Sequence, residues 1–180
     1  MTKKTSRRTK ERTDATVHDP QLFAVSLLSD AKGFLKAGQT LAAQRTLSLP
    51  LYFVLCHAME LILKSYLASS GATETELRKE VGHKLLRAYS RARKKGFSPS
   101  DARIPEIIRW MSPFHEDFFF RYRGTGHGRV QLPVANEFAD VVSTLIRQIE
   151  PIVRKRFKES RRLVTKPDDG GSSPPASDQP

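Results

Sequence analysis

The sequence has little of what disulfide-linked, metal-binding, secreted or membrane-spanning proteins need. Cys56 is the single cysteine among 180 residues, so no disulfide can form within the chain and we expect a reducing, cytoplasmic location. The five histidines are scattered, and without a closely spaced ligand set we predict neither a metal site nor a cofactor. No apolar stretch follows the basic N-terminal residues, so they do not read as a secretory signal.

Long apolar runs are also missing. The most apolar stretch, LPLYFVLCHAMELILKSYL (49–67), carries three ionisable side chains near its middle. A membrane span needs about 18 or more apolar residues with few or no charges. We therefore expect this stretch to be buried in a protein core, with no contact to a membrane.

Acidic residues are few compared with basic ones. The chain holds 31 Lys and Arg against 19 Asp and Glu, a formal net charge of +12. Residues 20–158 account for most of the excess, with 22 basic against 12 acidic residues. A folded domain with this charge attracts phosphates or acidic partners. The alternative is that the charge serves solubility.

The two ends of the chain differ in composition from its middle. Residues 1–19 are rich in Lys, Arg and Thr and lack apolar periodicity, which predicts a disordered basic arm. Residues 159–180 end in Pro, Gly, Ser and Asp, which predicts a disordered tail. The folded domain should therefore span residues 20–158.

Apolar residues within this domain recur with the helical period, and no segment alternates long enough to predict a strand. We expect an all-α fold, an antiparallel bundle of about five helices joined by short links. The predicted helices are 20–38, continued or linked through 40–47; 48–70; 82–96; two shorter pieces over 98–122 punctuated by Pro105 and Pro113; and a long last helix from Pro133.

The apolar second helix raises a question, because it contains His57, Glu60 and Lys64. Residues three and four apart share a helix face, so Glu60 can pair with Lys64 and accept a hydrogen bond from His57. One interpretation is a structural polar cluster at a seam between helices or subunits. Another makes Glu60 or His57 part of a functional site, and a third leaves all three in solvent.

The amino-acid pattern of these helices resembles that of a known protein family. HAMELILKSYL (57–67), followed by LRKEVGHKLLRAYSRARKKG (77–96), is similar to the second and third helices of HEPN domains, and FFFRYRGTGHG (118–128) resembles the Arg-Tyr stretch of one bacterial branch. The resemblance covers residues 20–158. It implies a four- or five-helix bundle, often paired as a homodimer and sometimes accompanied by a nucleotidyltransferase-type protein partner.

The resemblance also implies a catalytic motif. Many HEPN proteins are metal-independent ribonucleases that use an Arg followed, after four to six residues, by a His. Arg121 and His127 are the best-placed match. Their chemistry suits RNA cleavage, because histidine transfers protons near neutral pH and arginine stabilises charge on a phosphate. The same spacing occurs at Arg12–His18, at Arg78–His83 (where His83 fits the start of a helix) and at Arg109–His115.

Two functional hypotheses follow. The first is a protein that binds RNA or nucleotide, possibly a ribonuclease of a defence or toxin–antitoxin system, through Arg121 and His127 and through further basic residues: Arg123, Arg129, Lys84, Arg87, Arg91 and Lys95. The second is a catalytically inactive helical module that dimerises or docks a protein partner. Tyr122 follows Arg121 where active members commonly have a polar residue, and Gly124, Gly126 and Gly128 lie between Arg121 and His127 or directly after it, which counts against catalysis by this pair.

Overall fold

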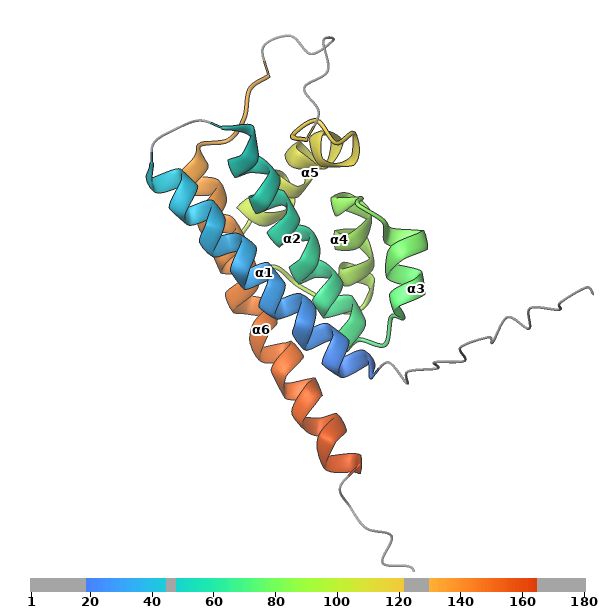
Figure 1. Ribbon diagram of the computed structural model, residues 1–180. Helices are drawn as coiled ribbons and strands as arrows, with labels where there is room; N and C mark the ends of the chain where they lie inside the picture. The colour runs from blue at the N-terminus through green and yellow to red at the C-terminus, as the bar shows by residue number, and fades with distance from the viewer. Residues whose placement is uncertain (1–18, 45–47, 122–129, 165–180) are drawn as a thin grey trace, which may run out of the picture.

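The computed structural model describes residues 19–44, 48–121 and 130–164 (Figure 1). These residues contain no β-strand, so the predicted all-α class is confirmed for the described part of the chain. The elements are α1 (Pro20–Ala43), α2 (Leu49–Ser69), α3 (Glu74–Glu76), a π-helical segment η1 (Leu77–Val81), α4 (Leu85–Lys94), α5 (Arg103–Glu116) and α6 (Ala135–Val164).

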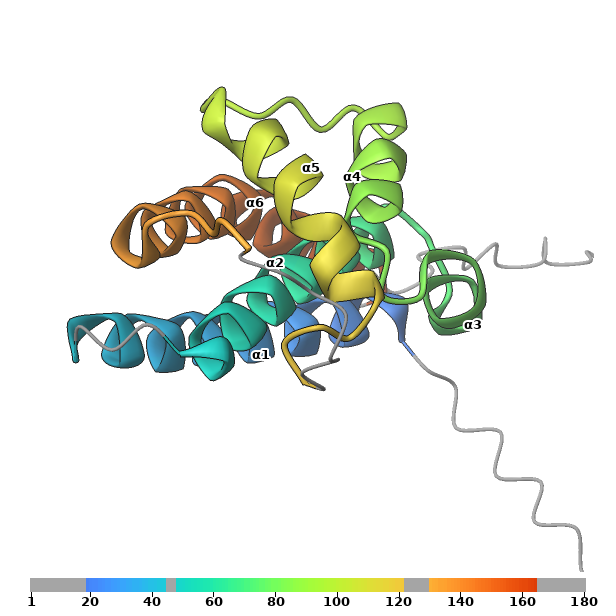
Figure 2. The ribbon, with the colours of Figure 1, turned by 90° about the horizontal axis from the view of Figure 1, so that it is seen from above.

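Helix α2 is the centre of the bundle. It contacts α1, α6, α4, α5 and η1, and Figure 2 shows α1 on one side of it with α4 and α5 on the other. Among the described helices it is the one long and apolar enough to cross a membrane, but 78% of its apolar window is buried inside the protein. This burial is that of a helix in the core of the bundle.

Helix α1 begins at its predicted cap and continues past Gly38. The Asp19 side chain accepts a hydrogen bond from the Gln21 backbone N–H at 2.8 Å, a standard N-cap. The helix does not stop near Gly38: the predicted continuation over 40–47 is confirmed as far as Ala43. A Cβ at Gly38 would lie 2.4 Å from Leu55 Cδ2, so the glycine permits close approach of α1 to α2.

The connection from α2 to α4 places His83 against the core. Thr73 and Glu76 form the predicted capping box, and η1 then leads to Gly82, which has a φ of 56°. This left-handed conformation favours glycine and turns the chain between η1 and α4. His83 follows directly after this turn, before α4 begins at Leu85.

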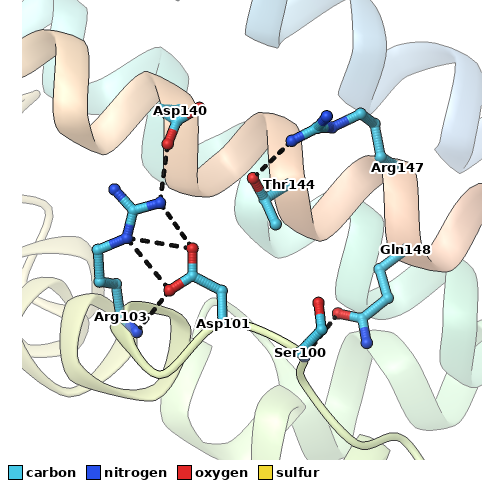
Figure 3. Close-up of polar contacts among 7 residues, drawn as sticks. All are labelled: Ser100, Asp101, Arg103, Asp140, Thr144, Arg147 and Gln148. Carbon is cyan, nitrogen blue, oxygen red and sulfur yellow. Dashed lines mark hydrogen bonds and ion pairs between the residues drawn. The ribbon is translucent and has the colours of Figure 1, made fainter.

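Two prolines that were expected to divide the next segment lie within a single helix. Pro105 occupies the first turn of α5, where no backbone donor is required, and Pro113 lies near its end. Ion pairs then tie the start of α5 to α6: Arg103 Nη2 lies 2.7 Å from Asp101 Oδ2 and 2.8 Å from Asp140 Oδ2 (Figure 3).

Helix α6 packs along α1 and α2 and extends beyond them at its C-terminal end (Figure 1). The chain before it is held by Tyr52, whose hydroxyl donates a 2.8 Å hydrogen bond to the Pro133 carbonyl. Near the other end, Arg156 Nη1 donates to the hydroxyls of Ser69 and Ser70 at 3.0 and 2.7 Å. These contacts fix α6 to both ends of α2.

Candidate functional site

A buried carboxylate on α2 organises the polar centre of the fold. Glu60 is 1% exposed, and its Oε1 accepts a 2.6 Å hydrogen bond from Lys64 Nζ. This pairing across one helical turn was predicted from the spacing and is confirmed. The expected hydrogen bond from His57 is wrong: its Nδ1 lies 3.7 Å from Glu60 Oε2, beyond hydrogen-bonding distance.

Two other histidines reach the same carboxylate from distant parts of the chain. Nε2 of His115, on α5, lies 2.6 Å from Glu60 Oε2. Nδ1 of His83, just before α4, lies 3.1 Å from the same oxygen. Three imidazoles and one ammonium group therefore surround one carboxylate, and we call His57, Glu60, Lys64, His83 and His115 the Glu60 cluster.

The cluster keeps Glu60 ionised. Burial by itself raises the pKa of the carboxyl, but hydrogen bonding to His115, the close approach of His57, and the charge and hydrogen bond of Lys64 together lower the pKa well below its ordinary value. A buried carboxylate without partners would favour its neutral form. The cluster is thus a fixed negative charge enclosed by groups that carry or can accept positive charge.

Aromatic rings connect the cluster to Arg121. The His57 ring stacks on Phe53 with ring centroids 5.9 Å apart, and Arg121 Cζ lies 4.8 Å from the centroid of the Phe53 ring. The same guanidinium lies 5.1 Å from the Phe118 ring, which in turn makes an edge contact with His83 at 5.6 Å. Arg121 is held between two aromatic rings that each touch a histidine of the cluster.

Phe118 adopts a backbone conformation that bulky residues rarely occupy. Its φ of 54° is the one positive value for a non-glycine residue in the described ranges. Such strain persists where the surroundings impose it and is common at functional sites. Here it reverses the chain after α5, and the Phe118 ring contacts both His83 and Arg121.

The structure positions one member of the predicted catalytic pair. Arg121 is exposed at the edge of the Glu60 cluster, whereas His127, Arg123 and Arg129 fall in 122–129, outside the described residues. The alternative pair Arg109–His115 does not converge, because Arg109 is exposed and His115 is buried on a different face of α5.

The predicted RNA-binding residues Lys84, Arg87, Arg91 and Lys95 lie on α4 or directly beside it, and acidic residues lie close to some of them. Arg91 pairs with Glu80, Arg87 Nη1 donates to the Glu80 carbonyl at 2.8 Å, and Lys84 Nζ lies 3.9 Å from Glu116 Oε2. Lys95 follows α4 and is exposed. Glu80 and Glu116 therefore reduce the positive charge that these four basic residues give to the surface.

Sequence reasoning missed His83 and His115 as members of the cluster. His83 was assigned to the start of the next helix, through capping and packing. No side-chain cap is formed there, but the ring packs against His115 and Phe118 and its Nδ1 lies 3.1 Å from Glu60 Oε2. Both histidines end a match to the Arg-to-His spacing, Arg78–His83 and Arg109–His115. That spacing relates each histidine to an arginine and gives no indication of a contact with Glu60. What places both histidines is the packing of distant segments on α2.

Comparisons with protein-family models, curated proteins and solved structures return no match to this chain. The resemblance to HEPN domains therefore rests on the sequence patterns of 57–67, 77–96 and 118–128 alone, and membership of that family is a hypothesis.

Proposed function

We propose that this chain is a HEPN-like protein that binds RNA and cleaves it without using a metal ion, as a defence or toxin–antitoxin ribonuclease would. The observation that carries the proposal is the position of Arg121. Its guanidinium lies over Phe53 and Phe118, beside two histidines of the Glu60 cluster. Stacking on the rings leaves the N–H groups at the guanidinium edge available for a phosphate.

This arrangement suits single-stranded RNA. Aromatic faces accept unstacked bases, and an arginine beside them binds the backbone phosphate. Phe118 is 37% exposed, so part of its surface is accessible to a base. Lys64 contributes a further positive charge to the same region, although Glu60 balances it.

The proposed reaction is an intramolecular phosphoryl transfer. The ribose 2′-oxygen attacks the adjacent phosphorus, the bond from phosphorus to the 5′-oxygen breaks, and the products are a 2′,3′-cyclic phosphate and a free 5′-hydroxyl. His127 exchanges the proton between the attacking and leaving oxygens, directly or through water, while Arg121 stabilises the negative charge that grows on the phosphoryl oxygens.

A cleavage assay tests this function. The full chain, treated with EDTA, is incubated with a labelled single-stranded RNA at low salt, and the products are separated by size and examined for cyclic phosphate ends. We expect Arg121→Ala and His127→Ala each to reduce cleavage by at least about a hundredfold. Arg109→Ala removes an exposed arginine from α5 and should cleave like the unmodified protein.

The result decides between activity and binding. If the unmodified protein neither cuts nor retains RNA at low ionic strength, the proposal is wrong. If it retains RNA without cutting it, and Arg121→Ala weakens retention, the chain is an RNA-binding relative without catalysis. Retention should weaken steeply as salt rises, because bound cations compete with the protein for phosphates.

A second candidate function, a helical interaction module, is supported by a different observation. Leu86 on α4 and Trp110 on α5 are 42% and 41% exposed, and the two helices pack on each other. Exposed large apolar residues favour protein contacts. We propose that these exposed residues join two copies of the chain or dock a nucleotidyltransferase-type partner. If they join two copies, sedimentation should show a dimer that Trp110→Ser converts to a monomer.

A further inference from the structure

The Glu60 cluster has more nitrogen donors than its carboxylate oxygen can satisfy. A carboxylate oxygen offers two lone pairs, and on Oε2 these are taken by Nε2 of His115 and Nδ1 of His83. Nδ1 of His57 points at the same oxygen from 3.7 Å and is buried without a hydrogen-bond partner among the described residues. Buried ring nitrogens are ordinarily paired, so this one requires an explanation.

We propose that His57, Glu60 and His115 form a binding site for one divalent transition-metal ion of the zinc class. One ligand atom from each of these three residues lies within 4.8 Å of the other two, and the nitrogens recorded nearest Glu60 Oε2 are Nδ1 of His57 and Nε2 of His115. Two imidazoles and one carboxylate are a common three-ligand set for Zn²⁺, with a water molecule in the fourth position.

The distances require small adjustments. Ligand bonds of about 2.0–2.1 Å in a tetrahedral site place neighbouring ligand atoms roughly 3.3 Å apart. Oε2 of Glu60 lies 2.6 Å from Nε2 of His115 and 3.7 Å from Nδ1 of His57, so one contact lengthens and the other shortens. The ion would replace the hydrogen bond from His115 and give the unpartnered nitrogen of His57 a ligand bond.

The remaining members of the cluster support the carboxylate from outside. Lys64 Nζ holds Oε1 at 2.6 Å, which leaves Oε2 to bind the metal through one oxygen. Nδ1 of His83 lies 3.1 Å from Oε2 and donates to its second lone pair. Hydrogen bonds of this kind orient metal ligands, and their loss typically weakens metal binding by about 10- to 100-fold.

The donor set selects the class of ion. Imidazole nitrogens bind Zn²⁺, Co²⁺ and Ni²⁺ well, whereas Mg²⁺ and Ca²⁺ prefer oxygen ligands, and this site offers one oxygen. The burial of His115 and Glu60, at 3% and 1% exposure, excludes the several waters that Mg²⁺ keeps. Mg²⁺ is therefore the matched negative control.

Calorimetric titration tests the site. The full chain, stripped with EDTA and dialysed, is titrated with ZnCl₂ without RNA, and we expect one ion per chain. His57→Phe keeps an aromatic ring between Phe34 and Phe53 but removes the ligand nitrogen, so affinity should fall by at least about tenfold. His18→Ala removes a histidine of the predicted basic arm and should bind like the unmodified chain, as should Cys56→Ala.

Two results would overturn the proposal. One is the absence of saturable Zn²⁺ binding by the unmodified protein, and the other is a folded His57→Phe variant that binds Zn²⁺ as tightly as the parent. Visible absorption of Co²⁺ gives a second readout, since a tetrahedral nitrogen and oxygen site produces an intense band that His57→Phe should lose. Circular dichroism confirms that the variant is folded.

The proposal is independent of RNA cleavage. Cleavage through Arg121 and His127 is measured in EDTA, and the metal titration is measured without RNA. Loss of one property with retention of the other therefore identifies which of the two proposals fails.

Discussion

Nε2 of His115 lies 2.6 Å from Oε2 of Glu60, and the two residues are 55 positions apart in the chain. The contact joins α5 to the central helix α2, and both side chains are almost completely buried. His83 and Lys64 bind the same carboxylate, so one acidic residue connects α2, α5 and the segment before α4.

Glu60→Gln should destabilise the fold by about 3 kcal/mol, because it removes one charge from a buried network and leaves Lys64 without its ionic partner. Urea unfolding at neutral pH, in EDTA, measures the free energy of unfolding. Glu150→Gln is the matched control: Glu150 pairs with Lys32 and Arg154 near the surface, and its loss should be below about 1 kcal/mol. Equal losses at the two positions would show that the cluster has no special structural role.

Two glycines of α1 should respond in opposite directions to alanine. A Cβ at Gly38 would lie 2.4 and 2.8 Å from Cδ2 and Cγ of Leu55, a fully buried side chain, whereas a Cβ at Gly33 meets nothing within 4 Å. Gly38→Ala should therefore destabilise by about 1–3 kcal/mol. Gly33→Ala should stabilise by up to about 1 kcal/mol, because alanine favours the helix. Thermal unfolding compares the two, and a stable Gly38→Ala variant would contradict the observed approach of α1 to α2.

Gly38 also shows how a correct sequence principle led to a wrong helix end. Glycine commonly follows the last turn of a helix, and it was interpreted in that way here. Its function is instead to allow a close contact with Leu55, 17 positions along the chain. Local patterns do not distinguish these two uses of glycine, because the second depends on which helix packs opposite.

Tyr52→Phe should loosen the start of α6. The Tyr52 hydroxyl donates to the Pro133 carbonyl, and removing a buried hydrogen bond typically costs about 1 kcal/mol. Amide hydrogen exchange should quicken in the first turns of α6, with little change in α4. Tyr89→Phe is the control, since the structure gives the Tyr89 hydroxyl no hydrogen-bond partner among the described residues. Unchanged exchange in Tyr52→Phe would mean that Pro133 is held by other contacts.

Cys56 should report on opening of the core. The thiol is fully buried in α2, so we expect it to react with a thiol reagent far more slowly than a free cysteine in the folded protein. Reaction in urea should follow the unfolding transition, with one equivalent per chain. Rapid reaction in native buffer would indicate that α2 is exposed to solvent, contrary to the fold described here.

The sequence predicted the parts of the fold that depend on local patterns. Apolar density placed 49–67 at the centre, and the spacing of Glu60 and Lys64 predicted their ion pair. The contacts of Glu60 with His83 and His115 span 23 and 55 positions, and no periodicity encodes them. The same applies to Arg121, whose place beside Phe53 results from the strained reversal of the chain at Phe118.

Arg121 lies over Phe53 and Phe118 beside the Glu60 cluster, and we propose that the protein contacts RNA there. Nuclear magnetic resonance of the full chain, titrated with a short single-stranded RNA at low salt, tests it directly. We expect the side-chain signals of Arg121, Phe53, Phe118 and His83 to shift first and furthest. Shifts confined to the basic residues of α4 or α6, with these four signals unchanged, would contradict it.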